Sequence, residues 1–187
     1  MGMDGSGSVL MRVVVVGGGS AGWMTAAALG RALGRDHQIL VLEDTGSTPD
    51  TGALAPFEST LPSLRAFNAM LGLDEARLMA SASATFKLGT RFTDWSRRGS
   101  RYIHPFSDFG GVLEGVAFHH YWLKLRQAGQ VEPFEDFSLA AVAARQGRFA
   151  RPSDDPRSVS STMSYGLHLD VAAYVSAVRD VADKAGV

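Results

Sequence analysis

Three glycines that follow a run of valines near the start of the chain have the spacing of a phosphate-binding turn. Gly17, Gly19 and Gly22 fit the pattern G-x-G-x-x-G within the stretch RVVVVGGGSAGW. The first glycine of this pattern permits a tight turn, the second lets the backbone approach a pyrophosphate, and the third lets a helix pack closely on a strand. The amide groups at the start of that helix, at Ser20 and Ala21, attract phosphate. The pattern therefore predicts a dinucleotide site.

An acidic residue stands where the same kind of site binds a ribose. Glu43 ends the apolar run QILVLE, about 20 residues after Gly22. An acid at this position accepts hydrogen bonds from the adenosine ribose, whereas an arginine would accommodate a 2′-phosphate. These residues favour FAD or NAD over NADP. A glycine turn that binds no ligand is the alternative interpretation.

A β-α-β unit must position these residues, and the fold class is α/β. The β-branched run 11–16 predicts a fully buried strand, and the alanine-rich segment 20–33 predicts a helix closed by Gly34. Segment 38–43 predicts a second buried strand, which gives the length that such a unit needs. Glycine, proline and threonine make 44–56 a predicted loop.

Helices dominate the rest of the predicted structure. One helix is expected from about Thr60, with Pro62 in its first turn, and another from Asp74. The last helix has the clearest pattern, since Asp170 can cap it and apolar residues recur on one face. Two more helices are predicted at 117–127 and 137–145. Two loops are predicted at 99–115 and 149–160.

The stretch ATFKLGTRFTDW, residues 84–95, has the period of two that is typical of a strand. One face would carry Phe86, Leu88 and Phe92, and the other Lys87, Arg91 and Trp95. We expect an antiparallel strand with a polar second face. A lysine in a protein interior can donate hydrogen bonds or, with a lowered pKa, act as a nucleophile. An ordinary half-exposed strand lysine is the alternative for Lys87.

The composition limits the classes of function. The chain has 187 residues, 45% of them hydrophobic and 20% charged, and a net charge of −1, which is typical of a globular domain without affinity for nucleic acid. It has no cysteine, so disulfides and thiolate chemistry are excluded. Residues 1–10 read as a disordered leader, and no apolar run is long enough for a signal peptide or a membrane span. We expect a cytoplasmic protein.

Several stretches besides the glycine turn are distinctive, and they occur in a fixed order. They are GGGSAGW, FESTLPSLRAFNAMLGLDE, ATFKLGTRFTDW, YIHPF and YGLHLDVAAYVSAVRDVADKAGV. Together they closely resemble the N-terminal portion of flavin-dependent halogenases of the tryptophan-halogenase family, over nearly all of 11–187. The resemblance implies a Rossmann-type FAD-binding β-α-β start with inserted helices and antiparallel strands, as in the first part of a flavin monooxygenase or halogenase fold.

The resemblance also implies a chemistry. Such enzymes use reduced FAD supplied by a separate flavin reductase, together with oxygen and chloride or bromide, to produce hypohalous acid. The oxidant passes to a lysine, which activates it toward an electron-rich aromatic substrate such as tryptophan or indole. The matching lysine in this sequence is Lys87.

Glu58 in FESTLP matches a family position in a loop beside the flavin. The family usually has a glycine-bearing GxGE stretch there, whereas this chain reads Ala55-Pro56-Phe57-Glu58. Glycines would permit close approach to the flavin, and Pro56 and Phe57 remove that freedom. The alternative for Glu58 is a carboxylate that stabilises the start of the following helix.

We expect no metal site, because His119 and His120 lack the i, i+4 spacing with which helical histidines share a metal. His104 could be a ligand, a base or a packed loop residue, and His168 reads as local structure before the last helix. Four aromatic residues could line a pocket or belong to ordinary packing: Trp95, Tyr102, Phe106 and Phe109.

Several family features are not present in these residues. The WxWxIP signature is not found, and in such folds the third parallel strand would follow KAGV. Because valine-rich strands with an unpaired edge tend to associate, we expect self-association or a complementing C-terminal segment. Two alternatives to a halogenase remain: a flavin-binding module or truncated homologue without halogenation, and another oxidoreductase, an FAD-dependent monooxygenase or an NAD enzyme, that shares the nucleotide motif.

Overall fold

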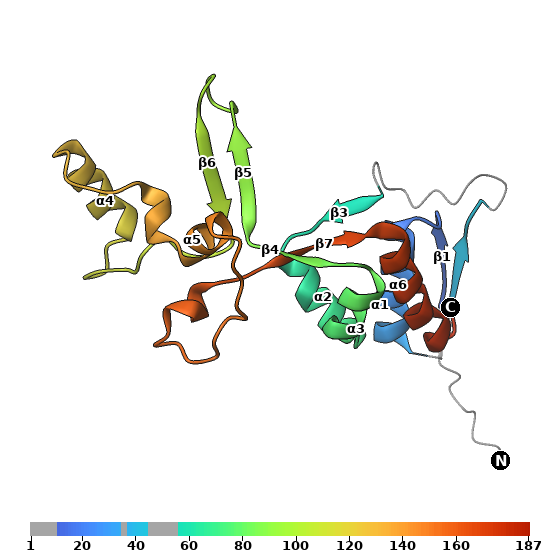
Figure 1. The fold of residues 1–187 in the computed structure, drawn as a ribbon. Helices are drawn as coiled ribbons and strands as arrows, with labels where there is room; N and C mark the ends of the chain where they lie inside the picture. Colours follow the sequence, from blue (N-terminus) through green and yellow to red (C-terminus); the bar gives the residue numbers. More distant parts are fainter. Residues whose placement is uncertain (1–10, 35–36, 45–55) are drawn as a thin grey trace, which may run out of the picture. The chain divides into compact units, whose positions relative to one another are not determined.

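The computed structural model describes residues 11–34, 37–44 and 56–187, so the predicted leader and most of the predicted loop at 44–56 lie outside the described residues. The chain divides into two compact units. The first unit comprises 1–59, 65–85 and 168–187, and the second comprises 60–64 and 86–167. Both are drawn in Figure 1.

The first unit contains the predicted β-α-β motif, which is confirmed. Strand β1 (Arg12–Val16) leads into helix α1 (Ser20–Leu33), and strand β2 (Gln38–Leu42) then pairs with β1 in parallel. The register runs from Arg12 opposite Gln38 to Val16 opposite Leu42. Helix α6 (Val171–Ala185) packs along α1. Figure 1 shows α1 and α6 side by side next to β1.

The expectation that both strands of this sheet are fully buried is wrong. Burial alternates along β1, and Val14 and Val16 are 48% and 82% exposed, while Leu42 at the end of β2 is 56% exposed. Helix α1 contacts both strands. Among the described residues these two strands form a sheet of their own. The apolar strands β1 and β2 therefore pack one face of their sheet against α1, and the other face is exposed.

Two short helices follow in the sequence. They are α2 (Ser63–Leu71) and α3 (Glu75–Ser81). The helix expected from Asp74 is confirmed, and the carboxylate of Asp74 caps α3, since it accepts a hydrogen bond from the Arg77 amide at 2.8 Å. Helix α2 begins later than expected, so Pro62 precedes it. The reason is that the Thr60 amide donates to the Leu167 carbonyl at 2.8 Å and keeps this segment extended.

A three-stranded sheet has the order β3-β7-β4. Its strands are β3 (Phe57–Ser59), β7 (Gly166–Asp170) and β4 (Thr85–Lys87). The central strand β7 pairs antiparallel with β3, with Glu58 opposite Leu169 and Ser59 opposite His168. Strand β7 was not predicted, and His168 therefore lies on a central strand rather than in local structure before a helix. The predicted cap of the last helix is confirmed. The Asp170 carboxylate accepts a hydrogen bond from the Ala173 amide at 2.8 Å and caps α6.

The predicted strand at 84–95 is divided at Leu88. Its second part, β5 (Gly89–Thr93), pairs antiparallel with β6 (Arg101–Pro105) in the second unit. Segment 101–105 was predicted as part of a loop, and that prediction is wrong. The division arises because β4 and β5 belong to different sheets. The Leu88 carbonyl between them accepts a hydrogen bond from the Phe106 amide at 2.7 Å.

The second unit also contains the two predicted helices. They are α4 (Phe118–Gln127) and α5 (Leu139–Arg145), and one-turn 3-10 helices lie at Phe134–Phe137 and Val159–Thr162. The buried Ser138 side chain accepts from the Ala141 amide at 3.4 Å and caps α5. No helix in the described parts of the chain is long and apolar enough to cross a membrane.

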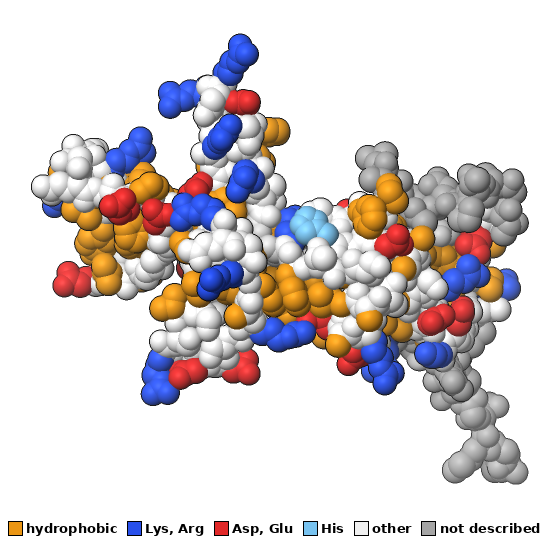
Figure 2. Space-filling view, in the orientation of Figure 1, with side chains coloured by type: hydrophobic (Ala, Val, Ile, Leu, Met, Phe, Trp, Pro, Cys, Tyr) orange, Lys and Arg blue, Asp and Glu red, His pale blue; other side chains and the backbone are white. Residues whose placement is uncertain are grey.

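Basic side chains gather over the β5–β6 hairpin in Figure 2. The arginines of this hairpin and its turn are all exposed: Arg91, Arg97, Arg98 and Arg101. The hairpin is therefore locally positive although the chain as a whole carries a net charge of −1.

Candidate functional site

The glycine turn of the first unit connects β1 to α1. The Gly17 amide donates a hydrogen bond to the Leu42 carbonyl at 2.8 Å, and Gly17 has a φ of 114°, a conformation that side-chain-bearing residues rarely adopt. Gly19 is the N-cap of α1 and supplies no side-chain hydrogen bond. The amides of Ser20 and Ala21 therefore begin the helix without a capping side chain.

The other two glycines of the turn have no space for a side chain. A Cβ on Gly22 would overlap the carbonyl oxygen of Gly17, and a Cβ on Gly18 would overlap the side chain of Glu43. Gly22 thus has the role predicted for the third glycine of the motif. The sequence motif did not include Gly18 as a required glycine. Its position within three consecutive glycines could have indicated that a side chain does not fit there. The turn is therefore packed so closely at Gly18 and Gly22 that only glycine fits at either position.

Glu43 lies beside this turn, directly after β2. Its Oε1 atom is 3.2 Å from Nη1 of Arg179 on α6. The guanidinium carbon of Arg179 lies 4.4 Å from the centre of the Trp23 ring. Trp23 is only 5% exposed. The structure therefore brings the predicted acid together with the glycine turn. It adds Arg179, which no local sequence pattern indicated.

Glu58 lies on the short strand β3, and its side chain is exposed. Because α2 begins at Ser63, Glu58 does not stand at a helix entry, and that alternative interpretation is wrong. The Pro56 carbonyl just before β3 accepts a hydrogen bond from the Val171 amide at 3.0 Å. Ala55, the first residue of the departure from the family pattern, lies outside the described residues.

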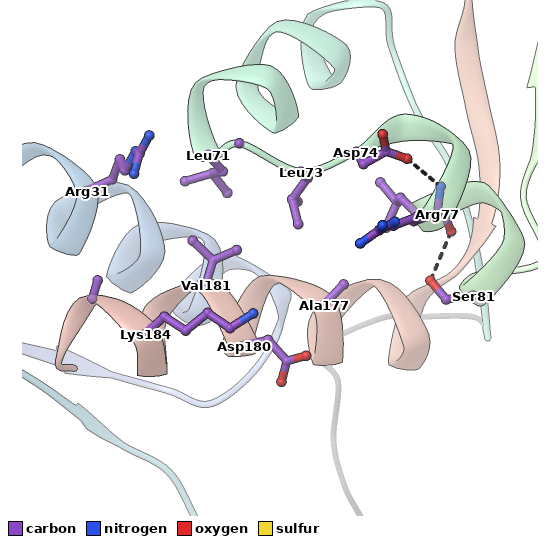
Figure 3. A pocket seen from close by; sticks show the side chains of 13 residues that line it. Arg31, Leu71, Leu73, Asp74, Arg77, Ser81, Ala177, Asp180, Val181 and Lys184 are labelled. Carbon is purple, nitrogen blue, oxygen red and sulfur yellow. Dashed lines mark hydrogen bonds between the residues drawn. The ribbon is translucent and has the colours of Figure 1, made fainter.

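A separate pocket of about 500 Å³ opens in the first unit against α6. Figure 3 shows apolar side chains, among them Leu71, Leu73 and Val181, with charged side chains around them. The charged residues of the rim come from α1, from α3 with its N-cap, and from α6: Arg31, Asp74, Arg77, Asp180 and Lys184. None of the site residues predicted from the sequence lines this pocket.

Lys87 in the second unit is buried, with 8% of its surface exposed. Its Nζ atom lies 5.3 Å from the centre of the Phe106 ring. Burial lowers the pKa of Lys87, because the charged form loses solvation. Among the described residues no carboxylate forms an ion pair with it. The predicted polar face is therefore wrong for this position, and Lys87 is an interior amine beside an aromatic ring.

The aromatic residues singled out from the sequence do not form one group. Tyr102 stacks on Phe92, whose ring also meets Trp95 edge-on, while Phe109 stacks on Phe134. Tyr102 and Phe109 line a pocket of about 580 Å³ together with His104, Trp122 and other residues. Trp95 and Phe106 do not line it.

The histidines bring no metal-binding cluster together. His119 and His120 are both exposed, at the start of α4, with ring centres 4.0 Å apart. His104 is exposed on β6, opposite Thr90. Within the described ranges no three residues among His, Asp and Glu are grouped so that they could hold a metal ion.

Comparison with known proteins identifies relatives over almost the whole chain. The family model described as tryptophan halogenase matches residues 12–187. Tryptophan 6-halogenase ThaL from Streptomyces albogriseolus is 31% identical over 189 residues, which cover 91% of this chain and 34% of that protein.

Solved structures give the same result. The structure of BrvH, a flavin-dependent halogenase from Brevundimonas sp. BAL3, matches with 42% identity and a TM-score of 0.83, over 95% of this chain and 34% of that one. A flavin-dependent halogenase from Xanthomonas campestris matches with 37% identity and a TM-score of 0.84, over 96% of this chain and 34% of that one. The chain thus spans 34% of the length of these relatives.

Proposed function

This chain belongs to the tryptophan halogenase family, and from that premise we propose that it is the FAD-binding first part of a flavin-dependent halogenase. Its substrate would be an electron-rich aromatic molecule such as tryptophan or indole, and chloride or bromide would be the co-substrate. A separate flavin reductase would supply reduced FAD by diffusion. The observation that carries the proposal is the buried amine of Lys87 beside an aromatic ring, with no carboxylate paired to it among the described residues, in a chain that also has a close-packed glycine turn.

The glycine turn supports the binding of FAD. Backbone amides at Gly17 and Gly19 and at the start of α1 would face the pyrophosphate, with Ser20 and Ala21 contributing the helix start. Glu43 would accept hydrogen bonds from the adenosine ribose. In its reduced form the bound flavin would supply, with oxygen and halide, the oxidised halogen that the reaction needs.

Lys87 would activate that oxidant. Its ammonium group would donate a hydrogen bond to the oxygen of hypohalous acid and make the halogen more electrophilic toward an aromatic ring. The surroundings support this role, because burial excludes water that would otherwise compete for the amine.

Glu58 would lie beside the flavin by its match to the family position. Its exposed carboxylate on β3 is available for such a contact. Pro56 and Phe57 stand where the family usually has glycine-bearing backbone, so the approach of this segment to the flavin would differ from that in the family pattern.

Two other functions are kept as alternatives. The chain would be a flavin-binding module without halogenation if it bound FAD but gave no halogenated product. It would be another FAD-dependent monooxygenase or an NAD enzyme if the product did not depend on halide or on Lys87.

The direct test is a coupled reaction with the purified chain, FAD, a flavin reductase, NADH, bromide or chloride, and tryptophan or indole, with products detected by mass spectrometry. Halogenated product that disappears in Lys87→Met and persists in Lys124→Met would support the proposal. Lys124 is an exposed lysine of the same unit and serves as the matched control. Product formation that is unchanged in Lys87→Met would contradict the role of this lysine.

A further inference from the structure

We propose that Arg179 is a positioning residue for the dinucleotide: it holds the Glu43 carboxylate against the glycine turn in the orientation that receives the ribose. The inference rests on the proposed binding of FAD. It extends the site from the glycine motif to helix α6, which the nucleotide-binding pattern does not include.

The two oxygens of the Glu43 carboxylate have different surroundings. Oε1 is 3.2 Å from Nη1 of Arg179. Oε2 lies on the side of the glycine turn, where a Cβ on Gly18 would overlap it. The ion pair thus engages one oxygen and leaves the other beside the backbone that would approach the phosphates and the ribose.

Trp23 fixes the position of the arginine. The guanidinium carbon of Arg179 lies 4.4 Å from the centre of the indole ring, within the range of a cation–π contact. Trp23 is buried in α1, the helix that begins at the glycine turn. A planar guanidinium that stacks on a ring keeps its edge available for a carboxylate, which an ammonium group cannot match. The stack therefore links α6, the first turn of α1 and the end of β2.

Burial indicates that this link serves orientation more than folding. The side chains of Arg179 and Glu43 are 48% and 29% exposed. Ion pairs that are open to solvent to this degree contribute little to stability. Holding one rotamer of the acid in advance of binding, by contrast, lowers the entropy lost when the ligand binds.

The test is a double-mutant cycle on FAD binding with the 187-residue chain. The variants are Arg179→Gln, Glu43→Gln and the double variant, and Arg31→Gln is the control for loss of an exposed arginine in the same unit. The dissociation constant for FAD is measured by fluorescence titration, and the thermal unfolding midpoint is measured without FAD. Arg179→Gln is expected to weaken FAD binding by roughly 3- to 10-fold, with an unchanged unfolding midpoint.

The cycle separates positioning from other roles. If Arg179 acts through Glu43, its substitution has no further effect on FAD affinity in the Glu43→Gln background. An equal loss of affinity in both backgrounds, or wild-type affinity of Arg179→Gln, would overturn the inference while leaving FAD binding in place. A wild-type chain that binds no FAD would overturn the inference together with the proposed function.

Discussion

Gly22 packs so closely on Gly17 that a methyl group at Gly22 would overlap the carbonyl oxygen of Gly17. The obstructing atom belongs to the backbone, so the turn itself must shift to accept a larger residue. We therefore predict that Gly22→Ala destabilises the fold by about 1–3 kcal/mol and abolishes FAD binding. Urea denaturation and FAD titration measure the two effects.

Gly111→Ala is the control for this substitution. A Cβ on Gly111 would have no atom within 4 Å, so the variant should unfold at the same urea concentration as the wild type. Wild-type stability of Gly22→Ala would show that the turn does not have the close packing described.

A buried hydrogen bond joins α6 to α2. The Tyr174 hydroxyl donates to Oδ1 of Asn68 at 2.9 Å, and burial raises the pKa of Tyr174, so that it remains a protonated donor at neutral pH. Tyr174→Phe leaves the Asn68 oxygen buried without this donor and should cost about 1–3 kcal/mol of folding free energy. Chemical denaturation provides the measurement.

Tyr121→Phe is the matched control, because its hydroxyl donates to the Leu113 carbonyl in an exposed bond that water can replace. It should cost less than about 1 kcal/mol. Equal losses in the two variants would contradict the importance assigned to burial of the first bond.

Lys87 should titrate below the ordinary lysine value of 10.5, because burial penalises its charged form. The unfolded chain then holds this proton to higher pH than the folded chain does. The contribution of Lys87 to stability therefore rises with pH between its folded pKa and 10.5. The sequence has three lysines, so NMR titration of their side chains can resolve each, and Lys87→Met assigns the signal. A midpoint at or above 10.5 would refute the interior placement.

The open face of the β1–β2 sheet predicts self-association of this chain. Val16 and its register partner Leu42 are both exposed on it. Val16→Lys should remove about 1.5 kcal/mol of apolar burial from a self-contact and raise the dissociation constant by about tenfold. Sedimentation velocity over a range of concentrations measures this, with Val159→Lys, an exposed valine of the other unit, as control. A wild-type chain that stays monomeric throughout would contradict the prediction.

The glycine motif and its β-α-β unit could be predicted because all of their determinants are local. Strand, turn and helix lie within 11–33, and the period of the apolar residues and the positions of the glycines define them. The cap of α6 by Asp170 was predictable for the same reason. Burial of the strands was not, because the exposure of Val14 and Val16 depends on which elements cover the sheet.

The features missed from the sequence depend on partners distant in the chain. Strand β7 is recognisable through its pairing with β3, and β6 through its pairing with β5. The break at Leu88, where the chain leaves one sheet and enters another, also depends on distant strands, and the period of two did not indicate that Lys87 is buried. Arg179 meets Glu43 because α6 packs along α1, and no local pattern reports such a contact.

The proposed function depends first on whether this chain retains FAD. The purified protein is mixed with FAD, free ligand is removed by gel filtration, and the visible spectrum of the protein peak is recorded. If the glycine turn binds FAD, the wild-type peak is yellow, with flavin absorbance that is lost in Gly22→Ala and retained in Gly111→Ala. A colourless wild-type peak would show that the glycine turn and Glu43 are not sufficient to bind FAD, and it would contradict the proposed function of this chain.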